Sequence, residues 1–152
     1  MRTVLLFLRG GLYFAVELLH VRRISALSAM LQLPSPAEGV LGVLNDGNHV
    51  VPVIEAPLPT PLPQPRPYRI LLLNNGESPF GFQVEALEGP RTLRFVPAVL
   101  PELLQQRPAL QEVPPEAIQR VHRASGVVGS PDMVVLVTPA PLYRARLLPE
   151  EG

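Results

Sequence analysis

The chain has 152 residues, of which 47% are apolar and only 5% aromatic, and its 13 basic and 13 acidic side chains leave no net charge. This balance gives no electrostatic reason to expect nucleic acid or an anionic membrane as a partner. Cysteine is missing, which excludes disulfides, thiolate nucleophiles and zinc–thiolate sites. The length suits one domain, or two very small intertwined ones, with a core of Leu, Val and Ile.

The N-terminal stretch predicts a β-hairpin. Two apolar runs, Val4–Leu8 and Tyr13–Val16, lie on either side of Gly10-Gly11, which can take positive φ cheaply. The first run is shorter than the core of a secretion signal, and Arg9 ends it. No apolar run in the chain approaches the roughly 18 residues that a membrane helix needs. We therefore expect a cytoplasmic protein with no direct membrane insertion.

The middle of the chain predicts a second hairpin. Between the two hairpins, residues 17–24 show apolar spacing that fits either one or two helical turns or a bent strand. The runs Val40–Leu44 and Val50–Ile54 then flank Asn45-Asp46-Gly47-Asn48, and Asp-Gly between apolar runs is a strong hairpin signal. Pro52 cannot donate to a ladder, so its strand is expected at a sheet edge or at a bulge.

Proline occupies every second position from Pro57 to Pro67. Such a segment is excluded from helices and sheet interiors and is expected to run as polyproline II. A stiff connector is the favoured interpretation, and a docking peptide for a proline-recognising domain is the alternative. The even spacing leaves no P-x-x-P pair inside the segment, which argues against the docking peptide.

The second half of the chain predicts further short strands and a helical stretch. Strands are expected at Tyr68–Leu73, Phe80–Leu87 and Arg91–Val96. Residues 97–124 read as helical, with Ile118 and Val121 forming the apolar stripe of a second helix. A last hairpin is expected to join residues 126–128 to residues 133–137. Many short strands separated by turn signals favour an all-β barrel or sandwich.

Signs of catalysis or of a cofactor are weak. The three histidines, His20, His49 and His122, are far apart, and none has a metal-type ligand three or four residues away. A G-x-S-x-G elbow and a phosphate-binding glycine motif are both missing. We therefore expect a protein that is not an enzyme and that has no metal site and no cofactor.

The order of residues in the central hairpin resembles the signature of CheW-like domains. Gly42-Val43-x-Asn45 is followed by the strand from Val50 to Glu55, and three further blocks of the chain match the family in order. These blocks cover residues 14–24, 81–87 and 126–137. CheW-like domains are adaptors that couple chemoreceptors to a histidine kinase in bacterial chemotaxis. The resemblance implies an all-β fold of two intertwined small five-stranded SH3-like barrels with short helices, and residues 1–152 as a single such domain.

The resemblance also implies two partner surfaces. The family grips the cytoplasmic tip of the chemoreceptor with aliphatic side chains near the first hairpin, and it pairs with the regulatory domain of the histidine kinase through the central hairpin. Carried over by position, the partner-binding residues are Leu18, Val21, Ile24, Gly42, Val43 and Asn45. The aliphatic positions among them are equally well explained as core, and Asn45 as a turn residue.

The chain departs from the family pattern at specific positions. Arg23 stands where the family usually has Glu, and Asn45-Asp46-Gly47-Asn48 lacks the Arg of the usual Asn-x-Arg-Gly. The C-terminal helix of the family is expected to be largely missing. A divergent adaptor of a twitching or gliding motility pathway is therefore an alternative function. A small ligand-binding β-barrel is the alternative from another class of protein.

Overall fold

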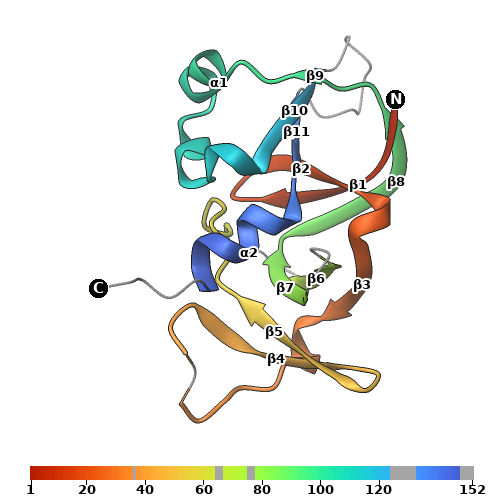
Figure 1. Ribbon diagram of the computed structural model, residues 1–152, viewed down its shortest axis with the longest axis vertical. Coiled ribbons are helices and arrows are strands. Elements are labelled where there is room, and N and C mark those ends of the chain that lie inside the picture. The colour runs from red at the N-terminus through yellow and green to blue at the C-terminus, as the bar shows by residue number, and fades with distance from the viewer. Residues whose placement is uncertain (36, 64–66, 75–77, 124–132, 148–152) are drawn as a thin grey trace.

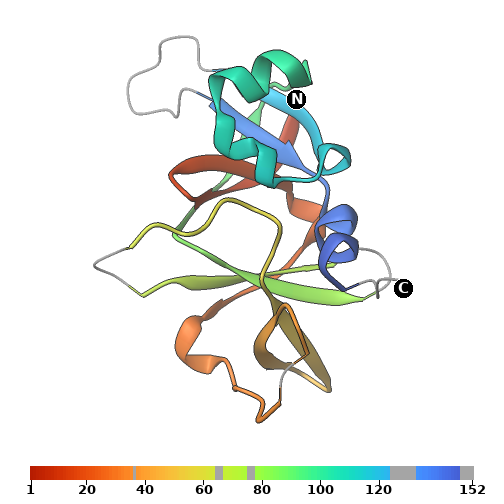
Figure 2. The same ribbon diagram turned by 90° about the vertical axis from the view of Figure 1, so that its left-hand side faces the viewer.

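A computed structural model describes residues 1–35, 37–63, 67–74, 78–123 and 133–147 of the protein (Figure 1). Over these ranges the backbone forms two β-sheets with short helices. The two sheets occupy the two halves of the molecule, one above the other in the view of Figure 2. Each sheet curls into a small barrel, which confirms the expected all-β architecture of two barrels.

The six-stranded sheet is built from both ends of the chain. Its strands run in the order β8-β1-β2-β11-β10-β9, and β2 and β11 pair in parallel while the other neighbours are antiparallel. Its strands are β1 (Arg2–Arg9), β2 (Leu12–Glu17), β8 (Ala86–Leu93), β9 (Val96–Pro97), β10 (Ile118–Arg123) and β11 (Met133–Val137). The two-residue β9 is one strand more than the five expected for each barrel.

The five-stranded sheet is built from the middle of the chain, in the order β3-β6-β7-β5-β4. Its strands are β3 (Val21–Ala26), β4 (Val40–Asp46), β5 (His49–Ile54), β6 (Arg69–Asn74) and β7 (Pro79–Val84). Because the chain enters this sheet after β2 and leaves it after β7, the two sheets are interlaced.

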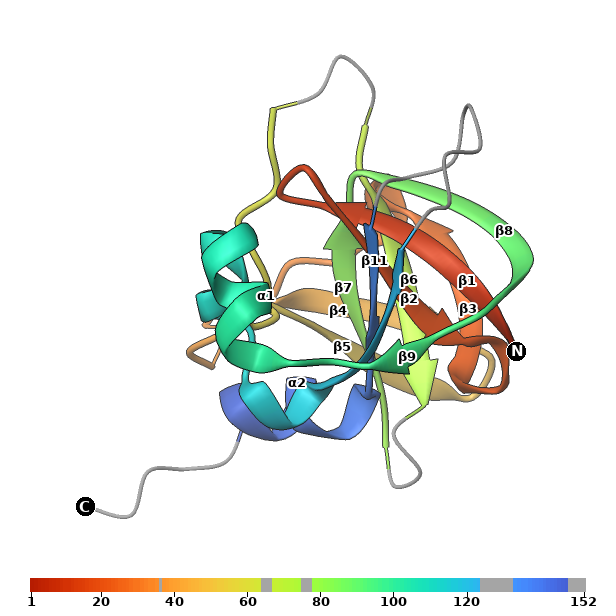
Figure 3. The same ribbon diagram turned by 90° about the horizontal axis from the view of Figure 1, so that it is seen from above.

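Short helices complete the structure, and α1 and α2 lie on the same side of the molecule (Figure 3). The α-helices are α1 (Leu100–Gln106) and α2 (Pro139–Leu147), and the 3-10 helices are η1 (Leu18–His20), η2 (Leu27–Ala29), η3 (Pro108–Glu112) and η4 (Pro115–Ala117). Residues 17–24 therefore combine both predicted forms, a helical turn followed by a strand.

The core has three parts, because the inner strands are buried on both faces. In β1, Leu5 and Phe7 point into a large cluster shared by both sheets, while Val4 and Leu6 point into a smaller cluster inside the six-stranded barrel. Alternate side chains of strand β6 likewise point into the shared cluster and into a third cluster, which lies inside the five-stranded barrel. Burial of both faces explains why these strands read as continuous apolar runs without alternation. The shared cluster includes the stacked Phe7–Phe14 pair, with ring centroids 5.5 Å apart.

The second predicted helix is confirmed only as the single turn η4 (Pro115–Ala117), and the helical prediction for Ile118 and Val121 is wrong, because residues 118–123 form strand β10. The register of β10 against β11 shifts between Ile118 and Arg120. This bulge lets Ile118 and Val121 point to the same side, and both are buried in the shared core. A spacing of three in a bulged strand looks the same as one turn of an amphipathic helix.

Two other expectations also need correction. The strand expected over residues 80–87 is broken at Glu85, and the strand expected over 91–96 is divided between β8 and β9. Toward the C-terminus the described residues form the short helix α2. It begins at Pro139, a position where a missing N–H carries no penalty. The first arm of the last predicted hairpin and its turn lie outside the described residues, and within those residues β11 pairs with β10 and β2.

Pro52 does not lie on an edge strand, since β5 runs between β7 and β4. The alternative expectation, a bulge, is met in this strand pair, because the register of β4 against β5 shifts between Val40 and Gly42. Val43, the partner of Pro52, exchanges both backbone hydrogen bonds with Leu31, so Val43 and Pro52 form a pair without hydrogen bonds to each other. On its other side, β5 pairs with β7 only at Val53 and Gly81. Pro52 therefore occupies an interior strand at a point where the ladder does not require its N–H.

Candidate partner-binding surface

The six candidate residues lie on η1, β3 and β4 and differ in exposure. Leu18 and Ile24 are each 40% exposed, and Asn45 is also exposed. Val43 is half-buried. Val21 packs against the shared core, and Gly42 is buried. Leu18, Ile24 and Asn45 are therefore accessible to a partner, whereas Val21 and Gly42 serve the packing of the protein itself.

Gly42 is enclosed by the segment that follows η2. A Cβ built at this position would lie 2.6 Å from the carbonyl oxygen of Leu31 and 2.7 Å from Cγ of Met30. Leu31 forms an isolated antiparallel bridge with the neighbouring Val43. Glycine at this position is explained by the close approach of this backbone, which covers part of β4.

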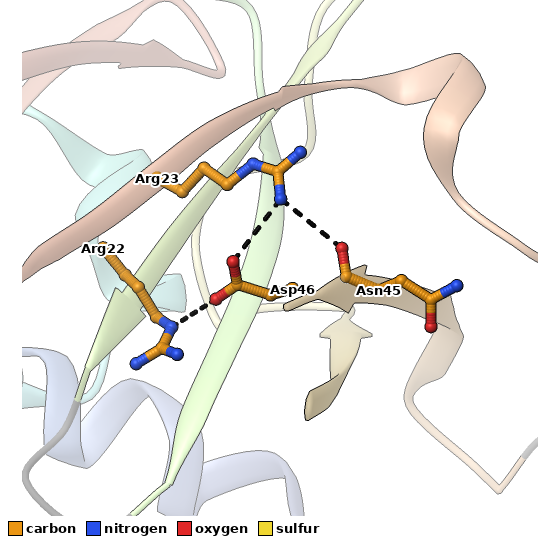
Figure 4. A network of polar contacts seen from close by, with 4 residues as sticks. All are labelled: Arg22, Arg23, Asn45 and Asp46. Atoms are coloured by element: carbon orange, nitrogen blue, oxygen red, sulfur yellow. Dashed lines mark hydrogen bonds and ion pairs between the residues drawn. The ribbon is translucent and has the colours of Figure 1, made fainter. Parts of the chain in front are cut away.

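A cluster of charged residues connects β3 to the β4–β5 hairpin (Figure 4). Arg22 donates from Nε to Asp46, and Arg23 Nη1 lies 3.4 Å from Asp46 Oδ1 and 3.4 Å from the carbonyl oxygen of Asn45. Strands β3 and β4 are the two edges of the five-stranded sheet. These contacts therefore bring the two edges together and help to close the barrel.

The same contacts set the electrostatics of the hairpin. The hydrogen bond from Arg22, together with the weaker contact from Arg23, holds the pKa of Asp46 below its usual range. Asp46 is therefore ionised near neutral pH and is satisfied by its arginine partners. Arg23 is about half exposed, so this face of the barrel presents a guanidinium to solvent.

Exposed apolar side chains also lie on the strands that carry the charged cluster. Val50 is 64% exposed and pairs across the hairpin with Asn45. Further exposed apolar residues on neighbouring segments are Leu31, Leu33 and Leu41. We name the exposed part of β3 and the β4–β5 hairpin, with Arg22, Arg23, Ile24, Asn45, Asp46 and Val50, the hairpin surface. Exposed apolar side chains and arginine are both frequent in protein–protein interfaces.

Leu18 belongs to a separate site. It lines a cleft of about 310 Å³ together with Leu19, Arg2, Thr3 and Glu17, and Arg2 forms an ion pair with Glu17 at its wall. The structure thus divides the exposed candidate residues between this cleft, with Leu18, and the hairpin surface, with Ile24 and Asn45. The sequence did not single out Leu19 and Val50, because an exposed aliphatic side chain has the same sequence signal as a buried one.

Among the described residues, no group of three or more His, Asp or Glu side chains is placed to hold a metal ion. Within the same ranges, no helix has both the length and the apolar character that crossing a bilayer requires.

The fold and the exposed surfaces define an all-β protein of two interlaced barrels with candidate docking sites. The family model for the CheW-like domain matches residues 3–109, and the chain belongs to this family. Among solved structures, it is similar to the scaffolding protein TtCheW from Thermoanaerobacter tengcongensis. The two share 11% sequence identity and a TM-score of 0.65, over 90% of this chain and 88% of that one. No curated protein matches the chain.

Proposed function

We propose that the protein is a non-catalytic adaptor that couples chemoreceptors to a histidine kinase in a bacterial chemotaxis-type pathway. Membership of the CheW-like family is the observation that carries this proposal. The similar solved structure is that of a scaffolding protein, which supports the same class of function. The 152 residues act as one domain in this proposal, since β10 and β11 lie beyond the matched range and yet pair within the sheet of β1 and β2.

The two surfaces have different partners in this proposal. The cleft at Leu18 takes the cytoplasmic tip of a chemoreceptor, and the hairpin surface takes the regulatory domain of the kinase. The hairpin surface carries the exposed Ile24 and Val50 and the partly exposed Arg23. Truncation or reversal of such central side chains commonly weakens an interface by tenfold or more.

The test uses the purified protein, a kinase regulatory domain and a receptor-tip fragment encoded in the same genome. Leu18→Glu is expected to weaken receptor binding, and Val50→Glu to weaken kinase binding, each by about tenfold or more with the other partner unaffected. Val99→Glu is the matched control, since Val99 is also exposed but lies next to α1. The proposal fails if the folded wild-type protein binds neither partner in a calorimetric titration.

An adaptor of a twitching or gliding motility pathway is the second candidate. It is favoured by two departures from the family pattern at the hairpin surface, Arg23 in place of the usual Glu and a turn without the usual Arg. A surface charge that meets a like charge on a partner costs binding free energy. A hairpin surface whose charges differ from the family pattern therefore favours a partner that differs as well. Titration against the kinase of each pathway distinguishes the two candidates, because the proper partner is expected to bind more tightly.

A further inference from the structure

Two charged side chains are buried where the two barrels meet. Arg9 is the last residue of β1, in the six-stranded sheet, and is 4% exposed. Glu85 is 6% exposed and lies between β7 and β8, where the chain passes from one sheet to the other. They are the only buried charged residues in the part of the chain that the structure describes. Such burial is costly unless each polar atom finds a partner.

Both side chains bind backbone on either side of the junction. Arg9 donates from Nε to the carbonyl oxygen of Pro59 at 2.7 Å and from Nη1 to that of Gln83 in β7 at 2.6 Å. Glu85 Oε1 accepts the N–H groups of Gly10 and Leu62, both at 2.7 Å. Each charged group thus holds one part of a barrel with one bond and the proline-rich segment with another.

The proline-rich segment needs such attachments. We name residues 57–63 the strap. Proline has no N–H, so the strap cannot join either sheet by a regular ladder of hydrogen bonds. Leu58 and Pro59 are nevertheless buried, and Tyr68 Oη donates to the carbonyl oxygen of Leu62 at 2.7 Å. The side chains of Arg9 and Glu85 therefore supply bonds that the strap's own backbone pattern cannot.

The environment of Arg9 is consistent with a structural position. Burial lowers the pKa of Arg9 to about 10, and the nearby carboxylate of Glu85 acts in the opposite direction. Arg9 is therefore still charged at neutral pH. A buried charge held by backbone carbonyls fixes geometry, because a shift of the strap costs the guanidinium its bond to Pro59 and leaves Nε without that partner.

We propose that Arg9 and Glu85 form a latch that fixes the strap across the junction and thereby sets the orientation of one barrel relative to the other. Loss of either side chain releases the strap and loosens the junction while each sheet stays folded. The inference concerns the fold of this chain and holds whether or not the proposed function is correct.

The first test measures hydrogen exchange at the amide of Leu62 by NMR in Glu85→Gln and Arg9→Met. Leu62 exchange is expected to rise about tenfold in both variants, with the Leu72 amide of β6 unchanged. Glu88→Gln and Arg91→Met are matched controls, since these two residues form a partly exposed ion pair on β8. Unchanged exchange at the Leu62 amide in Arg9→Met overturns the latch. An equal rise in exchange at Leu62 and Leu72 also overturns it, because that result indicates global destabilisation.

A matched glycine pair tests the strap with both charges intact. Gly10 and Gly47 share a φ of +63°, but a Cβ on Gly10 would lie 2.4 Å from Cβ of Pro59, whereas a Cβ on Gly47 meets nothing within 4 Å. Gly10→Ala is expected to raise Leu62 exchange, and Gly47→Ala to leave it unchanged. Equal exchange in the two variants contradicts the seating of the strap. This arm stays informative if Glu85→Gln or Arg9→Met does not fold.

The second test measures the orientation of the barrels. The chain has no cysteine, so Asn48→Cys on the hairpin and Thr92→Cys on β8 accept spin labels specifically. Both positions are exposed, one on each barrel. The distribution of distances between the labels is expected to broaden in Arg9→Met and Glu85→Gln and to stay narrow in the Glu88→Gln and Arg91→Met controls. A distribution unchanged by the latch variants refutes the orienting role.

Discussion

Arg23 on β3 and Asp46 on the β4–β5 hairpin lie 3.4 Å apart, measured from Nη1 to Oδ1. The sequence has Arg23 where CheW-like domains usually carry Glu, and Asp46-Gly47 where the hairpin usually carries an Arg. The structure brings these two departures together, since Arg23 contacts Asp46. The contact lies between the two edge strands of the sheet.

Asp46 makes the stability of the fold depend on pH. Its pKa is lowered in the folded state, chiefly by the hydrogen bond from Arg22, so its contribution is complete above the unfolded-state pKa of about 4 and is lost as the pH falls through the lower folded-state pKa. We expect the stability advantage of wild type over Asp46→Asn to shrink with acidification. Urea denaturation of both proteins across this pH range measures the difference in their free energies of unfolding. A difference that does not change with pH would contradict a stabilising role for the contacts of Asp46 with its arginine partners.

Gly42→Ala tests whether Gly42 is a packing residue or a partner contact. The added Cβ would lie 2.6 Å from the backbone oxygen of Leu31, which cannot rotate away. Overpacking of this kind typically lowers the free energy of unfolding by about 1–3 kcal/mol. Chemical denaturation is the measurement. Unchanged stability combined with weaker kinase binding would instead assign Gly42 to the partner interface.

Gly47→Arg restores the arginine that the family usually carries in this hairpin. The residue has a φ of +63° and open space around its Cβ, so we expect the variant to fold with a loss of about 1 kcal/mol from the left-handed backbone. Gly47→Ala has the same backbone penalty and is the control. Any difference in kinase affinity between the two variants then belongs to the guanidinium, and equal affinities indicate that a different surface binds the kinase.

Two prolines of the strap differ in burial and provide a matched pair. Pro59 is buried against Gly10, whereas Pro63 is exposed. Pro59→Ser is expected to lower the free energy of unfolding by about 1–2 kcal/mol, because it loses both packing and backbone restriction, and Pro63→Ser by less than about 1 kcal/mol. Thermal denaturation compares them. Equal losses would mean that each proline stabilises the protein only by restricting the backbone, and that the packing of Pro59 against Gly10 contributes nothing.

Much of the architecture could be predicted from the sequence, because the residue patterns that indicate turns and strands are local. Both N-terminal and central hairpins were predicted from glycines between apolar runs, and the structure places Gly10, Gly11 and Gly47 at positive φ as those turns require. The resemblance to CheW-like domains rested on residues 42–55 and on three further blocks in order, and the family model, which matches residues 3–109, confirmed the family. Turn chemistry and family signatures depend on neighbours in the chain, so they can be read without the fold.

The remaining features depend on residues distant in sequence. The bulge that makes Ile118 and Val121 share a face exists only in the pairing of β10 with β11. The sequence places Arg9, Pro59 and Glu85 far apart, and only the meeting of the two sheets puts them in one buried network. Likewise, the exposure of Ile24 and the burial of Gly42 follow from what packs over each strand. The sequence by itself determined the class of fold and the family, whereas the tertiary structure alone decided which side chains are exposed and which are buried, because burial is set by long-range contacts that periodicity does not encode.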